Sequence, residues 1–112
     1  MYEYRGYVRK IYDGDTITVD VDLGFGIELK GQKMRLLRIN APEVRGDQRP
    51  AGLKSRDALR GLIGNKWVII RTIRDKKGKY GRWLAEVFLD QGDTQLNVND
   101  WLITEGHAEP LE

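Results

Sequence analysis

Three short motifs carry side chains whose types and spacing could act together on a phosphate group: Asp13-Gly14-Asp15-Thr16, residues 34–43 (MRLLRINAPE) and Lys79-Tyr80-Gly81-Arg82. A guanidinium donates two parallel hydrogen bonds to phosphate oxygens and keeps its charge, which suits Arg35 and Arg82 to this task. A carboxylate such as Glu43 can act as the base that activates water. Arg35, Glu43 and Arg82 are therefore the candidate catalytic residues for hydrolysis of a phosphodiester.

A divalent cation would add Lewis acidity at the same phosphate oxygens. Hard cations bind oxygen ligands, and the candidate metal ligands are Asp15, the side-chain oxygen of Asn40 and the carbonyl of Ala41. Each motif alone has low specificity, because an Asp-Gly pair usually forms a turn and a single strand arginine is usually solvated. Only their joint occurrence in one chain points to a site.

The charge of this chain of 112 residues is distributed unevenly, although the net charge is only +2. Residues 30–82 contain sixteen Lys or Arg and four Asp or Glu, whereas residues 83–112 contain seven Asp or Glu and no Lys or Arg. This asymmetry predicts one basic face that would suit DNA or RNA. A basic loop could follow a phosphate backbone, and its candidate nucleic-acid-binding residues are Lys76, Lys77, Lys79 and Tyr80. Without the motifs, the same charges would suit a solvated loop.

Alternation of apolar and polar residues predicts five strands, at residues 4–12, 16–23, 28–39, 66–73 and 82–89. Gly24-Phe25-Gly26 is expected to turn a hairpin, and Gly31 to mark a bulge or bend. On the third strand we expect Arg35 to share a face with Leu37 and Ile39, where its charge would need an acidic neighbour or a ligand.

Apolar spacing of 3.6 residues predicts a helix at residues 50–63, whose buried arc would contain Ala51, Ala58, Leu59, Leu62 and Ile63. A short second helix is expected at 98–105, capped by Asn97 and ended by Gly106. Five strands with a helix between the third and the fourth predict a mainly β (α+β) protein, an OB-fold barrel. We expect a single domain over residues 1–112, with Leu111 and Glu112 set aside as a candidate tag remnant.

The three motifs together resemble the active site of the calcium-dependent staphylococcal nuclease family, and the resemblance covers most of the chain. It implies that Asp15 binds one Ca²⁺, that Arg35 and Arg82 hold the scissile phosphate, and that Glu43 activates water. It also implies contacts of Lys79 and Tyr80 with a second phosphate. The family hydrolyses DNA and RNA with little sequence preference and leaves the 3′-phosphate on the product.

Two positions differ from the pattern of this family. Its reference member has Asp where this chain has Asn40, and Thr where it has Ala41. Because affinity for a hard cation depends on the negative charge of the ligands, Asn40 predicts weaker calcium binding, and another divalent cation is an alternative. The change at Ala41 matters less if the ligand there is the carbonyl oxygen.

Two other functional classes remain open from the sequence. One is a non-catalytic OB-fold module that binds nucleic acid, and the other is a barrel whose basic loop binds an acidic protein. The absence of cysteine excludes a disulfide scaffold and a thiolate metal site. Without an apolar run for a signal or a membrane span, we expect a cytoplasmic protein with no membrane partner, export being left open. We also expect the protein to be a monomer.

Overall fold

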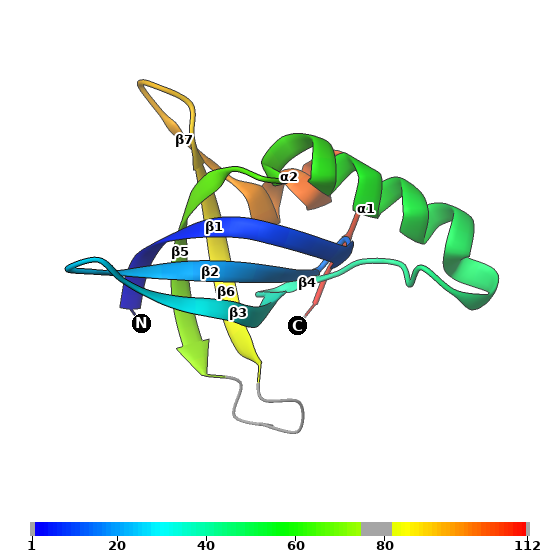
Figure 1. The fold of residues 1–112 in the computed structure, drawn as a ribbon. Helices are drawn as coiled ribbons and strands as arrows, with labels where there is room; N and C mark the ends of the chain where they lie inside the picture. The colour runs from blue at the N-terminus through cyan, green and yellow to red at the C-terminus, as the bar shows by residue number, and fades with distance from the viewer. Residues whose placement is uncertain (1, 75–81, 112) are drawn as a thin grey trace.

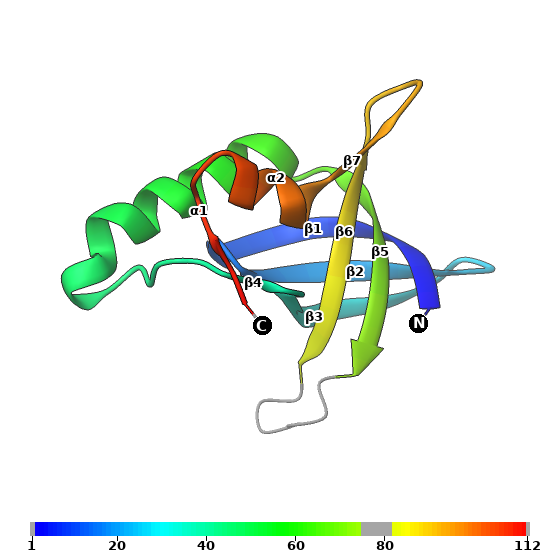
Figure 2. The same ribbon diagram turned by 180° about the vertical axis from the view of Figure 1, so that it is seen from behind.

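A computed structural model describes residues 2–74 and 82–111, and it shows a β-barrel with both helices packed on the same side (Figure 1; Figure 2). The barrel strands are β1 (Tyr2–Asp13), β2 (Thr16–Gly24), β3 (Ile27–Leu36), β5 (Trp67–Arg74) and β6 (Trp83–Asp90). Neighbouring strands run antiparallel in the order β3-β2-β1-β5-β6, and a parallel pairing of β3 with β6 closes the barrel. The predicted OB-fold is confirmed.

Alternation along the strands fills the barrel, as the sequence pattern requires. Apolar side chains from all five strands point inward and leave almost no exposed surface, among them Val8, Ile17, Val19, Met34, Ile70 and Val87. Apolar burial of this kind contributes about 25 cal/mol per Å² removed from water and holds the strands in register. No helix within residues 2–74 and 82–111 is long and apolar enough to cross a membrane.

The β2–β3 hairpin has the predicted turn and the predicted bulge. Gly24, Phe25 and Gly26 all have positive φ, at 82°, 56° and 74°. Gly31 has φ +65°, and the register between β2 and β3 shifts beside it. This bulge directs the Gly31 N–H at Asp20 Oδ1, 2.9 Å away, and Arg9 pairs with the same buried carboxylate. The bond from Arg9, followed by that from Gly31, lowers the pKa of Asp20.

The third strand ends at Leu36, three residues earlier than predicted. Arg38 follows with φ +68°, which turns the chain before a short strand β4 (Ile39–Asn40) that pairs with β8 (Glu109–Pro110). Because of this turn, Arg35 does not share a strand face with Ile39. It alternates instead with the buried Met34 and Leu36 and projects from the outer face of the barrel.

Helix α1 (Arg49–Ile63) follows a short 3₁₀ turn, η1 (Gly46–Gln48), and ends at the predicted Gly64. Its buried residues are Gly52, Ser55, Leu59 and Ile63, whereas Ala51, which was predicted to be buried, is exposed. Gly52 and Ser55, in the first half of the helix, are small, and other parts of the chain approach the helix closely there. Ser55 Oγ, for example, donates a hydrogen bond of 2.6 Å to the carbonyl of His107.

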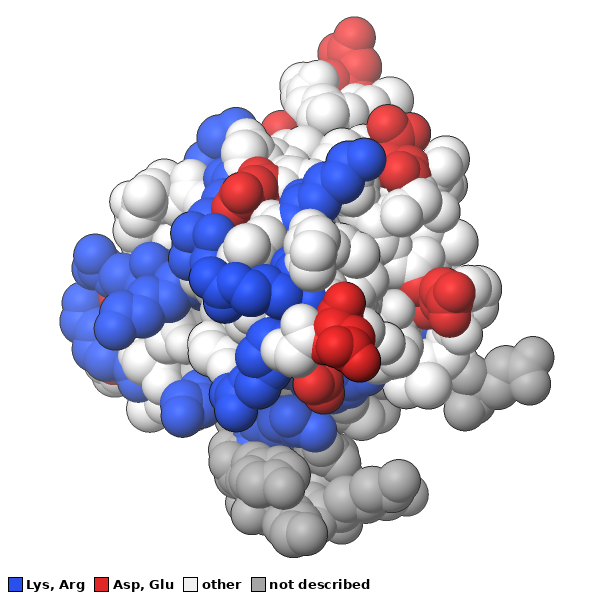
Figure 3. Space-filling view, turned by 90° about the vertical axis from the view of Figure 1, so that its right-hand side faces the viewer, with Lys and Arg blue, Asp and Glu red and all other residues white. Residues whose placement is uncertain are grey.

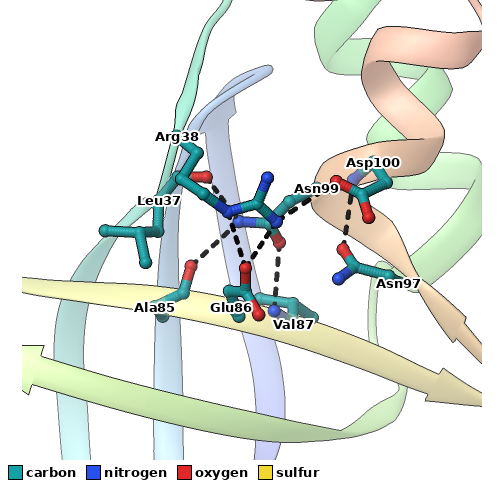
Figure 4. A network of polar contacts seen from close by, with 8 residues as sticks. All are labelled: Leu37, Arg38, Ala85, Glu86, Val87, Asn97, Asn99 and Asp100. Carbon is teal, nitrogen blue, oxygen red and sulfur yellow. Dashed lines mark hydrogen bonds and ion pairs between the residues drawn. The ribbon is translucent and has the colours of Figure 1, made fainter. Parts of the chain in front are cut away.

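Helix α2 (Val98–Thr104) follows strand β7 (Gln95–Asn97), which the sequence pattern did not predict. As expected, the Asn97 side chain caps the helix and accepts a hydrogen bond from the Asp100 N–H at 3.1 Å. Outside the barrel, Arg38 pairs with Glu86 of β6 and with Asp100 at 3.1 Å (Figure 4).

Asn99 links α2 to two barrel segments and is fully buried (Figure 4). Its Nδ2 donates to the carbonyls of Leu37 at 2.9 Å and Ala85 at 3.1 Å, and its Oδ1 accepts from the Val87 N–H at 3.0 Å. A buried amide with these bonds is stabilising only while all of them are made. The contact fixes the turn after β3, next to the candidate site.

Candidate active site and basic groove

Asp15 and Arg35 form the centre of the candidate site. The β1–β2 turn places Asp15 opposite the end of β3, where Thr16 is the register partner of Arg35. The Asp15 carboxylate is buried, and its Oδ2 lies 3.0 Å from Arg35 Nη1. This pair supplies the acidic neighbour that the sequence demanded for Arg35.

The segment after β3 brings Asn40 and Ala41 to the same place. Asp15 Oδ2 accepts a hydrogen bond from the Ala41 N–H at 2.9 Å, and Arg35 Nη2 donates to Asn40 Oδ1 at 3.3 Å and to the Ile39 carbonyl at 3.1 Å. The structure thus unites four of the residues singled out from the sequence. Asp15 and Ala41 are 26 positions apart in the sequence, and the fold of the barrel brings them into contact.

Gly14 allows this close packing. A Cβ at this position would lie 2.8 Å from the Ala41 Cβ and 2.9 Å from the Ser55 Cβ, closer than real side chains approach. The glycine therefore lets the β1–β2 turn touch both α1 and the Asn40–Ala41 segment. On the other side, the β4–β8 pairing holds Asn40 opposite Glu109.

Two carboxylates lie side by side in the turn. Burial, followed by the neighbouring Asp15 carboxylate, raises the pKa of Asp13 to about 6. Burial also opposes ionisation of Asp15, but the hydrogen bonds from Asp13 and Ala41 and the charge of Arg35 outweigh it and lower the pKa of Asp15. Asp15 therefore ionises before Asp13 as the pH rises, and a bound cation would relieve the repulsion between the two carboxylates once both are charged.

The candidate ligand atoms of Asp15, Asn40 and Ala41 are all oxygens, the type of ligand that hard divalent cations bind. An ionised carboxylate has about four acceptor sites. Asp15 uses three of them for Arg35, Ala41 and Thr16, and the fourth accepts a hydrogen bond from Asp13 while that acid is protonated. Within residues 2–74 and 82–111, no three His, Cys, Asp or Glu side chains form a cluster that could hold a metal ion. Neutral oxygens of Asn40 and Ala41 would have to complete the ligand set, which indicates weak affinity.

Glu43 lies at the exposed rim, and its backbone is held firmly. The Gln48 side chain accepts a hydrogen bond from the Glu43 N–H at 3.0 Å, and Arg49 Nη1 donates to the Val44 carbonyl at 2.9 Å. A Cβ on Gly52 would lie only 2.0 Å from the Glu43 carbonyl oxygen, so this segment rests directly on α1. Neither Gln48 nor Gly52 was singled out from the sequence.

Arg82 lies just before β6 and lines a groove with a volume of about 1150 Å³ between α1 and the barrel. The other candidate binding residues, Lys76, Lys77, Lys79 and Tyr80, lie outside the described part of the chain. Among the described residues that line the groove, none is Asp or Glu and seven are Lys or Arg: Arg9, Lys10, Lys33, Arg45, Arg56, Arg60 and Arg82. Lys and Arg side chains crowd one half of the face shown in Figure 3.

Sequence reasoning predicted a basic face but not this groove. Arg56 and Arg60 are four residues apart on α1 and therefore project from one side of the helix. That spacing was a usable signal. The remaining cations come from β1, β3, the segment after Glu43 and the residue before β6, and only the folded chain brings them together.

Fold and site together define an OB-fold barrel with a paired carboxylate and guanidinium beside a basic groove. The family model described as Staphylococcal nuclease homologue matches residues 33–112. The chain belongs to this family.

Three similar proteins come from three different organisms. A thermonuclease of Staphylococcus intermedius is 33% identical over 104 residues, covering 90% of this chain and 56% of that protein. The uncharacterized protein MJ1439 of Methanocaldococcus jannaschii is 30% identical over 128 residues, covering 94% of this chain and 58% of that protein. Endonuclease YhcR of Bacillus subtilis is 31% identical over 116 residues, covering 95% of this chain but 9% of that protein. The chain spans little more than half the length of the first two relatives.

Proposed function

We propose that this protein is a metal-dependent nuclease that hydrolyses DNA or RNA with low sequence specificity. The observation that carries the proposal is the Asp15–Arg35–Asn40 cluster next to a groove lined by cations, which it adjoins through Thr16, the register partner of Arg35. Two of the relatives are named as a thermonuclease and an endonuclease, which supports the same class of reaction. A purely binding surface would have no need of a carboxylate such as Glu43 beside the phosphate.

In this mechanism Arg35 and Arg82 bind the scissile phosphate and stabilise the charge that develops on its oxygens. Glu43 accepts a proton from the attacking water as its oxygen bonds to phosphorus. The bond from phosphorus to the 5′-oxygen breaks, that oxygen takes up a proton from solvent and leaves as a hydroxyl, and the phosphate stays on the 3′-oxygen. Asp15, with the oxygens of Asn40 and Ala41, would hold Ca²⁺ or another divalent cation. When bound, this cation supplies further Lewis acidity at the phosphate.

The first test is hydrolysis of single-stranded DNA and RNA with calcium, magnesium, manganese or chelator, followed by analysis of the product ends. We expect metal-stimulated cleavage that chelator abolishes. Glu43→Gln, Arg35→Ala and Arg82→Ala should each lower the rate by on the order of 10² or more. Glu105→Gln and Arg5→Ala, which make matched changes outside the site, should leave it unchanged. Wild-type rates in all three site variants would contradict the assignment, and binding without cleavage would establish the non-catalytic module instead.

A second prediction concerns the metal. Asn40→Asp adds a negative charge beside Asp15, so calcium should bind more tightly, on the order of tenfold. Activity should rise most at low metal concentration. Calorimetric titration of both proteins measures the change, and Asn97→Asp, which adds the same charge at the α2 cap, serves as the control. Equal or weaker affinity in Asn40→Asp would remove Asn40 from the metal site.

A further inference from the structure

The basic groove begins at the candidate site and leads away from it. Its near end is formed by Arg82 and Thr16, and Thr16 is the register partner of Arg35. Its floor follows β1 from Tyr12 back to Val8. At the far end, the Asn65 N–H donates to the Val8 carbonyl at 3.1 Å and joins the end of α1 to the barrel.

The walls of the groove differ from each other. Arg56 and Arg60 of α1 form one wall, and Arg60 Nη2 is fixed by a hydrogen bond of 3.1 Å to the Ile11 carbonyl. Lys10 and Lys33 lie on the barrel side and are exposed. Within residues 2–74 and 82–111, neither lysine makes an ion pair. Their charge is therefore available to an anion from outside.

The length of the groove suits a chain of phosphates rather than one small anion. Residues Val8 to Tyr12 extend for roughly 13 Å at the rise of a β-strand. A nucleic-acid strand with stacked bases rises about 3.4 Å per phosphate along its axis. Phosphates lie farther apart when the bases are unstacked, so the floor spans at most about three or four phosphates. The cations are spread along this length and do not converge on a single point.

An aromatic ring favours a single strand over a duplex. Tyr12 lies in the groove and is 52% exposed, with its hydroxyl oxygen accepting a hydrogen bond from Arg45 Nη2. Unpaired bases stack on such rings, whereas paired bases in a duplex are covered by their neighbours. Cations that follow the backbone and an aromatic ring beside them are the features of single-strand binding by OB-folds.

We propose that a single-stranded polynucleotide lies in the groove between α1 and β1, so that the protein holds about three or four phosphates on one side of the bond at Arg35 and Arg82. This inference rests on the proposed function only for the position of the scissile phosphate. The groove would then determine how binding affinity depends on the length of the substrate. It also gives Lys10, Lys33 and Arg56 a role separate from the chemistry.

The test measures binding without cleavage, in chelator and in the Glu43→Gln background, with fluorescent oligothymidylates of two to twelve nucleotides. Affinity should rise with length up to about six nucleotides and then level off. Replacing Lys10 and Lys33 by alanine should weaken binding of the longer strands at least tenfold, and should reduce the log-log salt slope by about 1.4, or 0.7 for each phosphate contact. Binding of the dinucleotide should be unchanged.

The control replaces Lys54 and Lys66 by alanine, which removes the same charge from exposed positions outside the groove. This variant should keep the wild-type slope. Arg56→Ala on the opposite wall provides a second variant and should lower the slope by about 0.7. Thermal unfolding of each variant shows that the fold is retained.

Several results would overturn the groove as the path of the strand. One is an affinity that stops rising at two nucleotides. Another is an equal log-log salt slope in the Lys10/Lys33 and Lys54/Lys66 double variants. A third is tighter binding of an oligoglutamate than of an oligothymidylate of equal charge. Cleavage that persists in Glu43→Gln would contradict the catalytic assignment while leaving the groove intact. Failure of the proposed function and failure of the groove are therefore distinguishable.

Discussion

Replacing the buried Asn99 by leucine is expected to lower the free energy of unfolding by roughly 2–5 kcal/mol. The substitution keeps the volume but removes three hydrogen bonds, to Leu37, Ala85 and Val87. Ala85 still accepts a bond of 2.9 Å from the Leu37 N–H, so the cost falls mainly on the other two groups. Each buried polar group that loses its partner costs about 1–3 kcal/mol.

Urea or guanidinium unfolding measures this loss, with Asn97→Ala as the control. Asn97 caps α2 from two residues away through one exposed bond, and its replacement should cost only about 1 kcal/mol. Since a domain of this size is stable by about 5–15 kcal/mol, Asn99→Leu could remove a large part of the total. Equal losses in the two variants would show that the Asn99 bonds do not hold α2 to the barrel.

Gly52→Ala is expected to lower kcat on the order of 10²-fold. An added Cβ would lie 2.0 Å from the carbonyl oxygen of Glu43 and 2.4 Å from its carbonyl carbon, so the segment carrying the proposed base must move away from α1. A displacement of about 1 Å at a reacting group can cost roughly 10² in rate. The effect should appear in kcat more than in the binding of oligonucleotides, because six of the seven groove cations lie on other segments and only Arg45 follows Glu43.

Gly61→Ala in the same helix is the matched control. A Cβ there has nothing within 4 Å, so alanine should raise stability by about 0.5–1 kcal/mol and leave kcat unchanged. Steady-state hydrolysis of single-stranded DNA and thermal unfolding of both variants check these outcomes. A folded Gly52→Ala protein with the wild-type kcat would mean that α1 does not set the position of Glu43.

The barrel and its long helix could be predicted from the sequence because both rest on repeated apolar spacing. The five strands alternate over eight or more residues, and α1 ends at Gly64 as expected. Short elements carry no such pattern. Strands β4, β7 and β8 have two or three residues each, too few for a period to be visible. The end of β3 was misplaced because Arg38 adopts a positive φ, which its residue type does not signal.

The contacts between candidate site residues were only partly predictable. Arg35 has the expected acidic neighbour, Asp15, but the expected reason was wrong, because β3 ends at Leu36 and Arg35 shares no strand face with Ile39. The contact between Gly52 and Glu43 could not be predicted from the sequence. A glycine in a helix indicates only weak helix propensity, whereas here its missing side chain lets the Glu43 backbone lie against α1. Likewise, the sequence indicates only that Asn99 is a polar residue in a helix. Its hydrogen bonds to the carbonyls of Leu37 and Ala85 depend on the folded structure. Such roles belong to tertiary contacts between distant segments.

The parallel pairing of β3 with β6 also bears on how the chain folds. Its partners Met34 and Trp83 lie far apart in sequence. The segment between them must therefore lose conformational entropy before the pairing stabilises the barrel. The β1–β2–β3 meander needs only short loops and can place Asp15 beside Arg35 by itself. Arg82 joins them only when the last seam of the barrel closes. Completion of the site therefore requires closure of the barrel, and a chain arrested before closure would hold Arg35 beside Asp15 without Arg82.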